Sequence, residues 1–219
     1  MLDTLTELIR QELLHPEWEA TRQLLAFMEV EWENGLPKIV GVDIDEEEGT
    51  AAVYVAVKGV SFCMGFYFSI DEEIELCGPT CAVPSTFIDF SPWSKELSCE
   101  ELLSLTMLTP QRVERVEQGG EDQGSFINSL YFEAESRPGP IAKRLGEFLA
   151  YLEQDIPGVQ NLVQRTGDNQ VLVGVAYHIA NRNFNDLYLP FDLIARLHRL
   201  GLELTFDLLA EGKELDGYY

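Results

Sequence analysis

The spacing of apolar residues changes from helical to strand-like near residue 38, and this change constrains the fold more than any other feature of the chain. Before it, residues 2–13 carry leucine and isoleucine at helical spacing, and a second helical stripe runs over residues 18–32. Asn34-Gly35 is typical of the end of that second helix. After it, residues 38–76 are rich in valine, phenylalanine and tyrosine and are interrupted by acidic turns. The pattern predicts two helices followed by an antiparallel meander.

A second unit begins after Cys77–Pro84, a segment with two prolines and a glycine that ends the β pattern. From residue 85 onward, strand and helix patterns alternate, with helices predicted from Ser98, over residues 141–156 and from Pro190. Pro157-Gly158 is expected to end the second of these helices. We therefore expect an α+β protein with N-terminal helices and a meander in residues 1–84. Residues 85–219 should form a second small α+β sheet unit, whose strand directions the pattern leaves open.

The chain is strongly acidic, with a formal net charge of −23 from 38 acidic and 15 basic side chains. It is 46% hydrophobic and 11% aromatic, which is too apolar for a disordered acidic tail, so a folded surface must carry the charge. Such a surface repels nucleic acid and anionic membranes and attracts basic proteins. We expect a basic protein partner, and neither nucleic acid nor a membrane.

The cysteines and the first residues indicate the compartment. Cys63, Cys77, Cys81 and Cys99 lack the Cys-x-x-Cys spacing of zinc sites. The first residues form an amphipathic pattern without the basic and apolar regions of a signal peptide. We expect free thiols in a cytoplasmic protein, with no metal and no other cofactor.

Two acidic runs are the candidate partner-binding residues, and they flank the middle strands of the meander. The first run does not fit a calcium loop, because the sixth and twelfth positions from Asp43 are Glu48 and Tyr54 instead of glycine and glutamate. Each run also fits a plain solvated turn, and both turns can lie on one edge of the meander. The candidates are Asp43, Asp45, Glu46, Glu47, Glu48, Asp71, Glu72 and Glu73.

No catalytic residue is predicted, and the sequence leaves open whether the protein is an enzyme. The histidines are His15, His178 and His198, and none belongs to a His-Glu-x-x-His motif. His178 shares its predicted strand face with Gly174 and Ala176, which favours a structural histidine on a close-packed face against a helix. Phosphate-binding glycine loops and a nucleophile elbow do not occur.

Five stretches carry a family resemblance: residues 97–105 (Leu-Ser-Cys-Glu-Glu-Leu-Leu-Ser-Leu), 109–112, 117–119, 125–133 and, best of all, 187–209. Over about residues 85–210 the chain resembles the bacterial domain-of-unknown-function family numbered four-two-seven-nine. It departs from that family's final Asp-aliphatic-Asp-aliphatic-Tyr strand, because Thr205 precedes Phe206-Asp207 and Leu209 replaces the aromatic residue. The resemblance implies a small bacterial α+β domain and supplies no catalytic residues.

Three functions follow from these observations. The first is a non-enzymatic binding protein of immunity or antitoxin type, whose acidic surface covers a basic partner. The second is an enzyme or small-ligand binder with a pocket between the two units, lined by aromatic residues. The third is a homo-oligomeric structural module that uses the meander edges and the tail Tyr218-Tyr219. The aromatic residues expected around the pocket are Trp32, Tyr67, Phe87, Trp93 and Tyr177.

Overall fold

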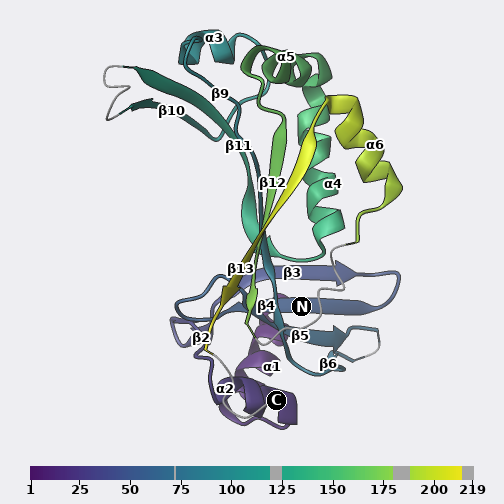
Figure 1. Cartoon of the computed structure of the whole chain (residues 1–219). Coiled ribbons are helices and arrows are strands. Elements are labelled where there is room, and N and C mark those ends of the chain that lie inside the picture. The colour runs from purple at the N-terminus through teal and green to yellow at the C-terminus, as the bar shows by residue number, and fades with distance from the viewer. Residues whose placement is uncertain (72, 119–124, 180–187, 214–219) are drawn as a thin grey trace.

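The computed structural model describes residues 1–71, 73–118, 125–179 and 188–213, and it has the predicted α+β fold. Figure 1 shows two parts. The lower part contains the N-terminal helices and one sheet, and in the upper part helices cover one face of a second sheet. Glu72 and the tail Tyr218-Tyr219 lie outside the described residues.

The N-terminal part packs α1 and α2 against an antiparallel sheet of order β3-β4-β5-β6, with β7 paired to β5. Alternate residues of β4 and β5 face the helices and join Leu5 and Ile9 of α1 in one buried cluster. The elements are α1 (Leu2–Leu14), α2 (Glu19–Leu25), β3 (Ile39–Asp45), β4 (Thr50–Ala56), β5 (Cys63–Ser69), β6 (Glu75–Leu76) and β7 (Cys81–Val83). The predicted meander is therefore confirmed.

The second helix is shorter than predicted, and Asn34-Gly35 forms a hairpin turn instead of ending that helix. α2 ends at Leu25, and Trp32 lies in the short strand β1 (Trp32–Glu33), which pairs with β2 (Leu36–Pro37). Asn34 and Gly35 have φ angles of 53° and 82°. Two successive residues with positive φ form the tight turn that Asn-Gly favours in hairpins.

The C-terminal part has a mixed sheet of order β10-β11-β8-β12-β13, with β9 paired to β11. The strands are β8 (Ser85–Phe90), β9 (Trp93–Ser94), β10 (Arg112–Glu117), β11 (Phe126–Pro138), β12 (Gln170–His178) and β13 (Glu203–Glu211). β12 and β13 are parallel, and the other pairs are antiparallel. Since parallel neighbours need a crossover connection, the helix between β12 and β13 is required by the pairing.

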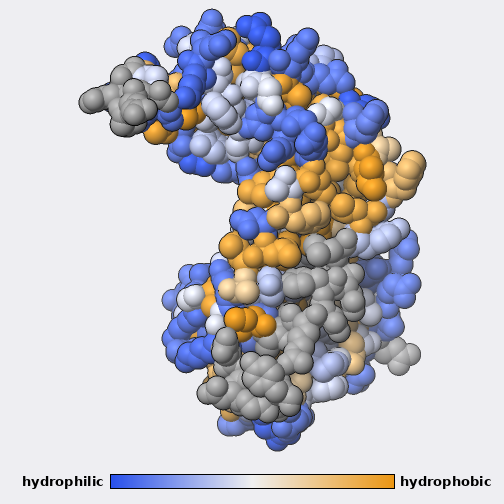
Figure 2. All heavy atoms as spheres, viewed as in Figure 1, coloured by the Kyte–Doolittle hydropathy of each residue, from blue (hydrophilic) through white to orange (hydrophobic). Residues whose placement is uncertain are grey.

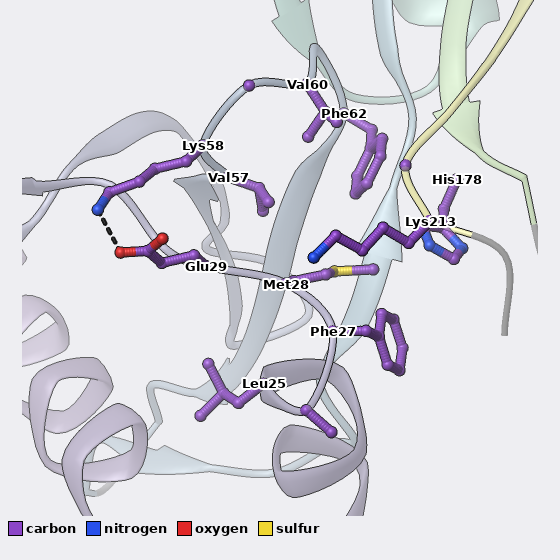
Figure 3. A pocket seen from close by; sticks show the side chains of 13 residues that line it. Leu25, Phe27, Met28, Glu29, Val57, Lys58, Val60, Phe62, His178 and Lys213 are labelled. Atoms are coloured by element: carbon purple, nitrogen blue, oxygen red, sulfur yellow. Dashed lines mark hydrogen bonds and ion pairs between the residues drawn. The ribbon is translucent and has the colours of Figure 1, made fainter. Parts of the chain in front are cut away.

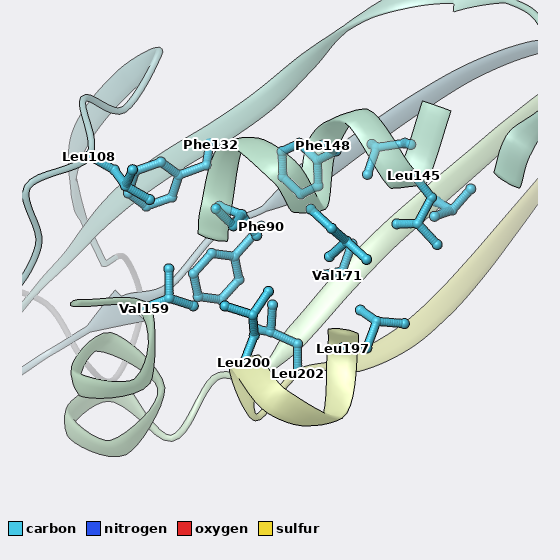
Figure 4. Packing of buried hydrophobic residues seen from close by; sticks show 14 of the residues in the cluster. Phe90, Leu108, Phe132, Leu145, Phe148, Val159, Val171, Leu197, Leu200 and Leu202 are labelled. Atoms are coloured by element: carbon cyan, nitrogen blue, oxygen red, sulfur yellow. The ribbon is translucent and has the colours of Figure 1, made fainter. Parts of the chain in front are cut away.

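Helices α4 and α6 pack on one face of this sheet, and Figure 4 shows the cluster between them and the strands. Phe90, Phe132 and Val171 reach it from three strands, and Phe148 and Leu197 reach it from the helices. The helices are α3 (Cys99–Leu103), α4 (Ile141–Leu152), α5 (Ile156–Thr166) and α6 (Phe191–Leu200), with a 3-10 turn over Glu153–Asp155. Ser98 and Glu101 form the predicted capping box of α3.

Pro157-Gly158 does not end the helical region, contrary to the sequence prediction. α5 begins there, and the Asp155 side chain accepts a hydrogen bond of 3.0 Å from the Gly158 N–H. Proline is tolerated in the first turn of a helix, where its missing N–H would have no intrahelical partner. A Pro-Gly pair can therefore lie at a helix end or at a helix start. Here the Asp155 side chain caps α5, so the pair lies at a helix start.

The two parts meet through β12, β13 and the start of α4. The Glu211 carboxylate accepts hydrogen bonds from the Ser61 N–H (2.5 Å) and hydroxyl (3.1 Å). Lys143 forms an ion pair of 2.8 Å with Asp43. The two buried clusters lie on either side of Pro84 in the sequence, while the division into units at that residue stays a prediction.

Leu152 is 0% exposed in the C-terminal core, so we expect its replacement by alanine to be costly. Leu152→Ala should lower the free energy of unfolding by about 2–5 kcal/mol, because buried apolar contacts are lost and a cavity remains. Urea denaturation measures this change. Met107→Ala is the control, since Met107 is 83% exposed and its loss should change stability by less than about 0.5 kcal/mol. Equal effects in the two variants would contradict the assignment of this helix face.

Candidate protein-binding surface

The first acidic run forms the turn between β3 and β4, and its carboxylates face solvent. Asp45 organises the turn, since its Oδ1 accepts the N–H groups of Glu47 (3.1 Å) and Glu48 (3.0 Å). Gly49 closes the turn with a φ of 61°, a value that favours glycine. Glu46, Glu47 and Glu48 are exposed. Asp45 therefore shapes the turn, while the three glutamates project their charge outward.

The second acidic run lies beside the first, as the sequence analysis anticipated. The Ile70 N–H donates to the Gly49 carbonyl at 2.8 Å, and a Cβ added to Gly49 would lie 1.8 Å from Asp71 Oδ1. The register of β4 and β5 causes this contact, since Thr50 pairs with Ser69. We call the result the acidic turn surface, which consists of Asp45, Glu46, Glu47, Glu48, Asp71 and Glu73.

Within the described part of the chain, no carboxylate of the acidic turn surface forms an ion pair. Most of the described lysines and arginines are occupied by other acids: Arg10 by Glu7, Arg22 by Glu19, Lys38 by Glu31, Lys58 by Glu29, Arg112 by Glu114 and Glu133, Arg137 by Glu147, Lys143 by Asp43, and Arg196 and Arg199 by Glu153. None of these ion pairs therefore offsets the negative charge of the acidic turn surface.

Asp43 belongs to the same run in the sequence but makes internal contacts. It pairs with Lys143 of α4, and the Tyr54 hydroxyl donates to it at 3.1 Å. Burial opposes its ionisation, but the hydrogen bonds and charge of Lys143 and Tyr54 together lower the pKa of Asp43. Burial and the Asp43 carboxylate raise the pKa of Tyr54. Asp43 thus joins the two parts of the protein, whereas the acidic turn surface faces solvent.

A pocket between the two parts has a volume of about 630 Å³ and is shown in Figure 3. Its walls are residues 25–29, residues 57–60, Phe62, His178 and residues 212–213. None of the five aromatic residues predicted for such a pocket lines it, although Tyr67 lines a second pocket between the two parts, together with Pro140 and Lys143. The aromatic lining is Phe27 and Phe62, which the sequence analysis missed because they become neighbours only when the ends of β12 and β13 reach the N-terminal part.

His178 is buried at the back of this pocket, between two aromatic rings. Its ring centroid lies 5.5 Å from that of Phe27 and 5.3 Å from that of Phe62, the latter edge-on. Burial lowers the pKa of His178, while a hydrogen bond with the Lys213 backbone opposes this change. The predicted packing against a helix is wrong, because this strand face turns away from α4 and α6. On the same face, a Cβ at Gly174 would lie 1.8 Å from Phe87, so that ring covers the glycine.

The cysteines are free thiols. Burial raises the pKa of Cys63 to about 11, which keeps this thiol protonated at neutral pH. Cys81 Sγ lies 3.4 Å from the Tyr67 hydroxyl. Among the described residues, no group of three or more histidine, cysteine or acidic side chains is placed to hold a metal ion. No helix in that part of the chain has the length and apolar character needed to cross a membrane.

Comparison with known proteins gives no match: neither a protein family, nor a curated protein, nor a solved structure is significantly similar to this chain. The resemblance of residues 85–210 to the bacterial family described above therefore stays a prediction.

The buried His178 should make stability depend on pH. Its pKa in the folded protein is lower than the 6.5 of an exposed histidine, so below about pH 6.5 the unfolded chain binds more protons than the folded one. The free energy of unfolding should therefore decrease as the pH falls through this range. Urea denaturation at about pH 7.5 and about pH 5.5 measures the difference.

His178→Gln should remove this part of the pH dependence, and His198→Gln should retain it because His198 is exposed. A pH dependence in the His178→Gln variant equal to that of the unchanged protein would contradict the role given to the buried imidazole.

Proposed function

We propose that this protein is a non-enzymatic binding module that docks a basic partner protein on its acidic turn surface. An immunity or antitoxin role in the bacterial cytoplasm is the form of this proposal that the sequence favours. The observation that supports it most directly is the convergence of two acidic turns whose carboxylates form no ion pair in the described residues, since Lys143, which lines a pocket with Asp45, pairs with Asp43 instead. Such a surface accelerates encounter with a basic partner and depends on ionic strength.

The pocket beside His178 supports a small-ligand function less well. Two of its three charged residues, Lys58 and Glu29, pair with each other, and Figure 3 shows this pair pointing away from the imidazole, while the Lys213 side chain extends across the pocket toward Met28. The His178 imidazole is held neutral by burial, so it contributes little attraction for an anion at neutral pH. Apolar side chains such as Met28 and Val60 form much of the remaining wall.

Neutralising the acidic turn surface should weaken binding to a basic probe without unfolding the protein. The variant Asp45→Asn/Glu46→Gln/Glu47→Gln/Glu48→Gln keeps an oxygen at residue 45 that can accept the two turn N–H groups. Exposed charges contribute little to stability, so the thermal midpoint should change by only a few degrees. Affinity for an oligolysine peptide, measured by calorimetry at low ionic strength, should fall about tenfold, and its salt dependence should flatten.

The matched control neutralises exposed glutamates elsewhere, as Glu17→Gln/Glu33→Gln/Glu96→Gln. It removes three negative charges, against four in the turn variant, and leaves the acidic turn surface intact. Equal losses of affinity in the two variants would show that only total charge matters and would refute the proposed docking surface. Unfolding of the turn variant would show that the run has a structural role.

A further inference from the structure

Among the described residues, the strand β13 has one edge that no other strand covers. It pairs with β12 in an uninterrupted parallel register from Glu203 to Glu211, and no other described strand pairs with it. Leu208 and Leu209 are 43% and 39% exposed, which is high for leucines in a nine-residue strand. Figure 1 shows β13 as the outermost strand of the upper sheet, running down toward the N-terminal part.

The hydrogen bonds with β12 show which main-chain groups point outward. The Glu203 N–H donates to the Asn169 carbonyl, and the Glu211 carbonyl accepts from Ile179. Alternate residues of a strand in a parallel ladder bond to the same neighbour, so the odd-numbered residues of β13 bond to β12. The even-numbered residues therefore direct their N–H and C=O groups to the open edge. These residues are Leu204, Phe206, Leu208 and Ala210.

The two faces of β13 differ in chemistry. Leu204 and Phe206 lie on the face that packs toward the helices. On that side α6 adds exposed apolar surface through Phe191 (83% exposed) and Ile194 (49%). Figure 2 shows apolar atoms gathered around the waist of the molecule, where β12, β13 and the base of α6 lie. The opposite face of β13 is acidic, and its charged residues are Glu203, Asp207 and Glu211.

The charges of β13 disfavour its pairing with β13 of a second copy of the same chain. If two copies of β13 paired antiparallel over all nine residues, Glu203 would face Glu211 and Asp207 would face its own counterpart. Like charges at directly opposed positions destabilise such a pair. A long exposed edge without proline or bulge nevertheless invites strand addition, and basic side chains are what its acidic face would attract.

We infer that an extended segment of a basic partner protein adds to β13 as a further strand of the sheet. Its main chain would bond to the outward groups of Leu204, Phe206 and Leu208. Its side chains would alternate between lysine or arginine, facing Glu203 and Asp207, and apolar residues, facing the Phe191 side of α6. This inference rests on the proposed function for its basic partner, and it adds a contact at β13 to the contact proposed at the acidic turn surface.

Two synthetic peptides of equal composition test the inference. In one, lysine and isoleucine alternate over nine positions; in the other, the same residues are grouped in blocks. The alternating peptide should bind at least about tenfold more tightly by calorimetry, a difference of about 1.4 kcal/mol. Two further peptides carry N-methyl groups on the alternating sequence, one at the odd-numbered and one at the even-numbered residues. Only one of the two should lose the tighter binding, because only one set of peptide N–H groups faces β13.

Two matched protein variants test which edge of the sheet binds the alternating peptide. Leu208→Pro removes an outward N–H from β13 without removing a bond to β12, and proline is tolerated at such edge positions. Val113→Pro removes an outward N–H in the same way at β10, the opposite edge of the sheet. The Gln118 N–H bonds to the Ser125 carbonyl, directly before β11, and alternate residues of β10 bond to β11 in the same way. Val113 lies at the other phase of this alternation, so its N–H points outward. Leu208→Pro should lose the preference for the alternating peptide, and Val113→Pro should keep it.

The outcomes separate this inference from the proposed function. Equal affinity for the alternating and blocked peptides, with salt dependence for both, would overturn strand addition and leave the acidic docking function standing. No binding of either peptide at low ionic strength would overturn the proposed function as well. Loss of the preference in Val113→Pro but not in Leu208→Pro would place the added strand at β10 and overturn the assignment to β13. Peptide-dependent dimers in size-exclusion chromatography would also contradict the 1:1 addition inferred here.

Discussion

The pairing of β12 with β13 is the interaction on which the arrangement of the whole molecule depends. The first halves of these strands belong to the C-terminal core, where Val171 and Val173 are fully buried. Their far ends leave that core and contact the N-terminal part: His178 packs between Phe27 and Phe62, and Glu211 accepts hydrogen bonds from Ser61. One continuous ladder thus fixes how the two sheets face each other. A segment that docks on β13 would bind the element that joins the two parts.

The described cations are distributed unevenly, so the negative charge is stronger on some parts of the surface than on others. Some acids are paired with cations, as in the Lys143–Asp43 pair between the two parts and the two arginines that share Glu153. Asp45–Glu48 and Asp71, where the backbone turns, are among the carboxylates without an ion pair in the described residues, and so are Glu203 and Asp207 of β13. Exposed carboxylates contribute little to stability, so charge at these positions can serve recognition with little cost. This separation is the physical basis for assigning a docking function to a surface without catalytic chemistry.

Local patterns in the sequence predicted most elements but not their neighbours. The stripe of α1, the meander and the capping box at Ser98 are encoded within a few residues, and all three appear in the structure. Asn34-Gly35 and Pro157-Gly158 were misinterpreted because each pair suits two structures, a helix end or another turn, and distant pairing or capping decides. The contact of Gly49 with Asp71 depends on strand register, and the Phe27–His178–Phe62 stack depends on how the two parts meet. Spacing along the chain carries neither kind of information.

The edge position of β13 is a further feature that spacing along the chain does not predict, and it matters for recognition. From its sequence, β13 is an alternating strand, with apolar residues at Leu204, Phe206, Leu208 and Ala210 and with acids at three of the other five positions. The same alternation on a central strand would put Asp207 between two neighbours, where its carboxylate would need a partner. On an edge the acid faces solvent and opposes pairing with another copy, while the outward groups of Phe206 and Leu208 stay available to a chain of opposite charge. Edge position and charge thus act together: the first permits addition of a strand, and the second selects which strand can be added.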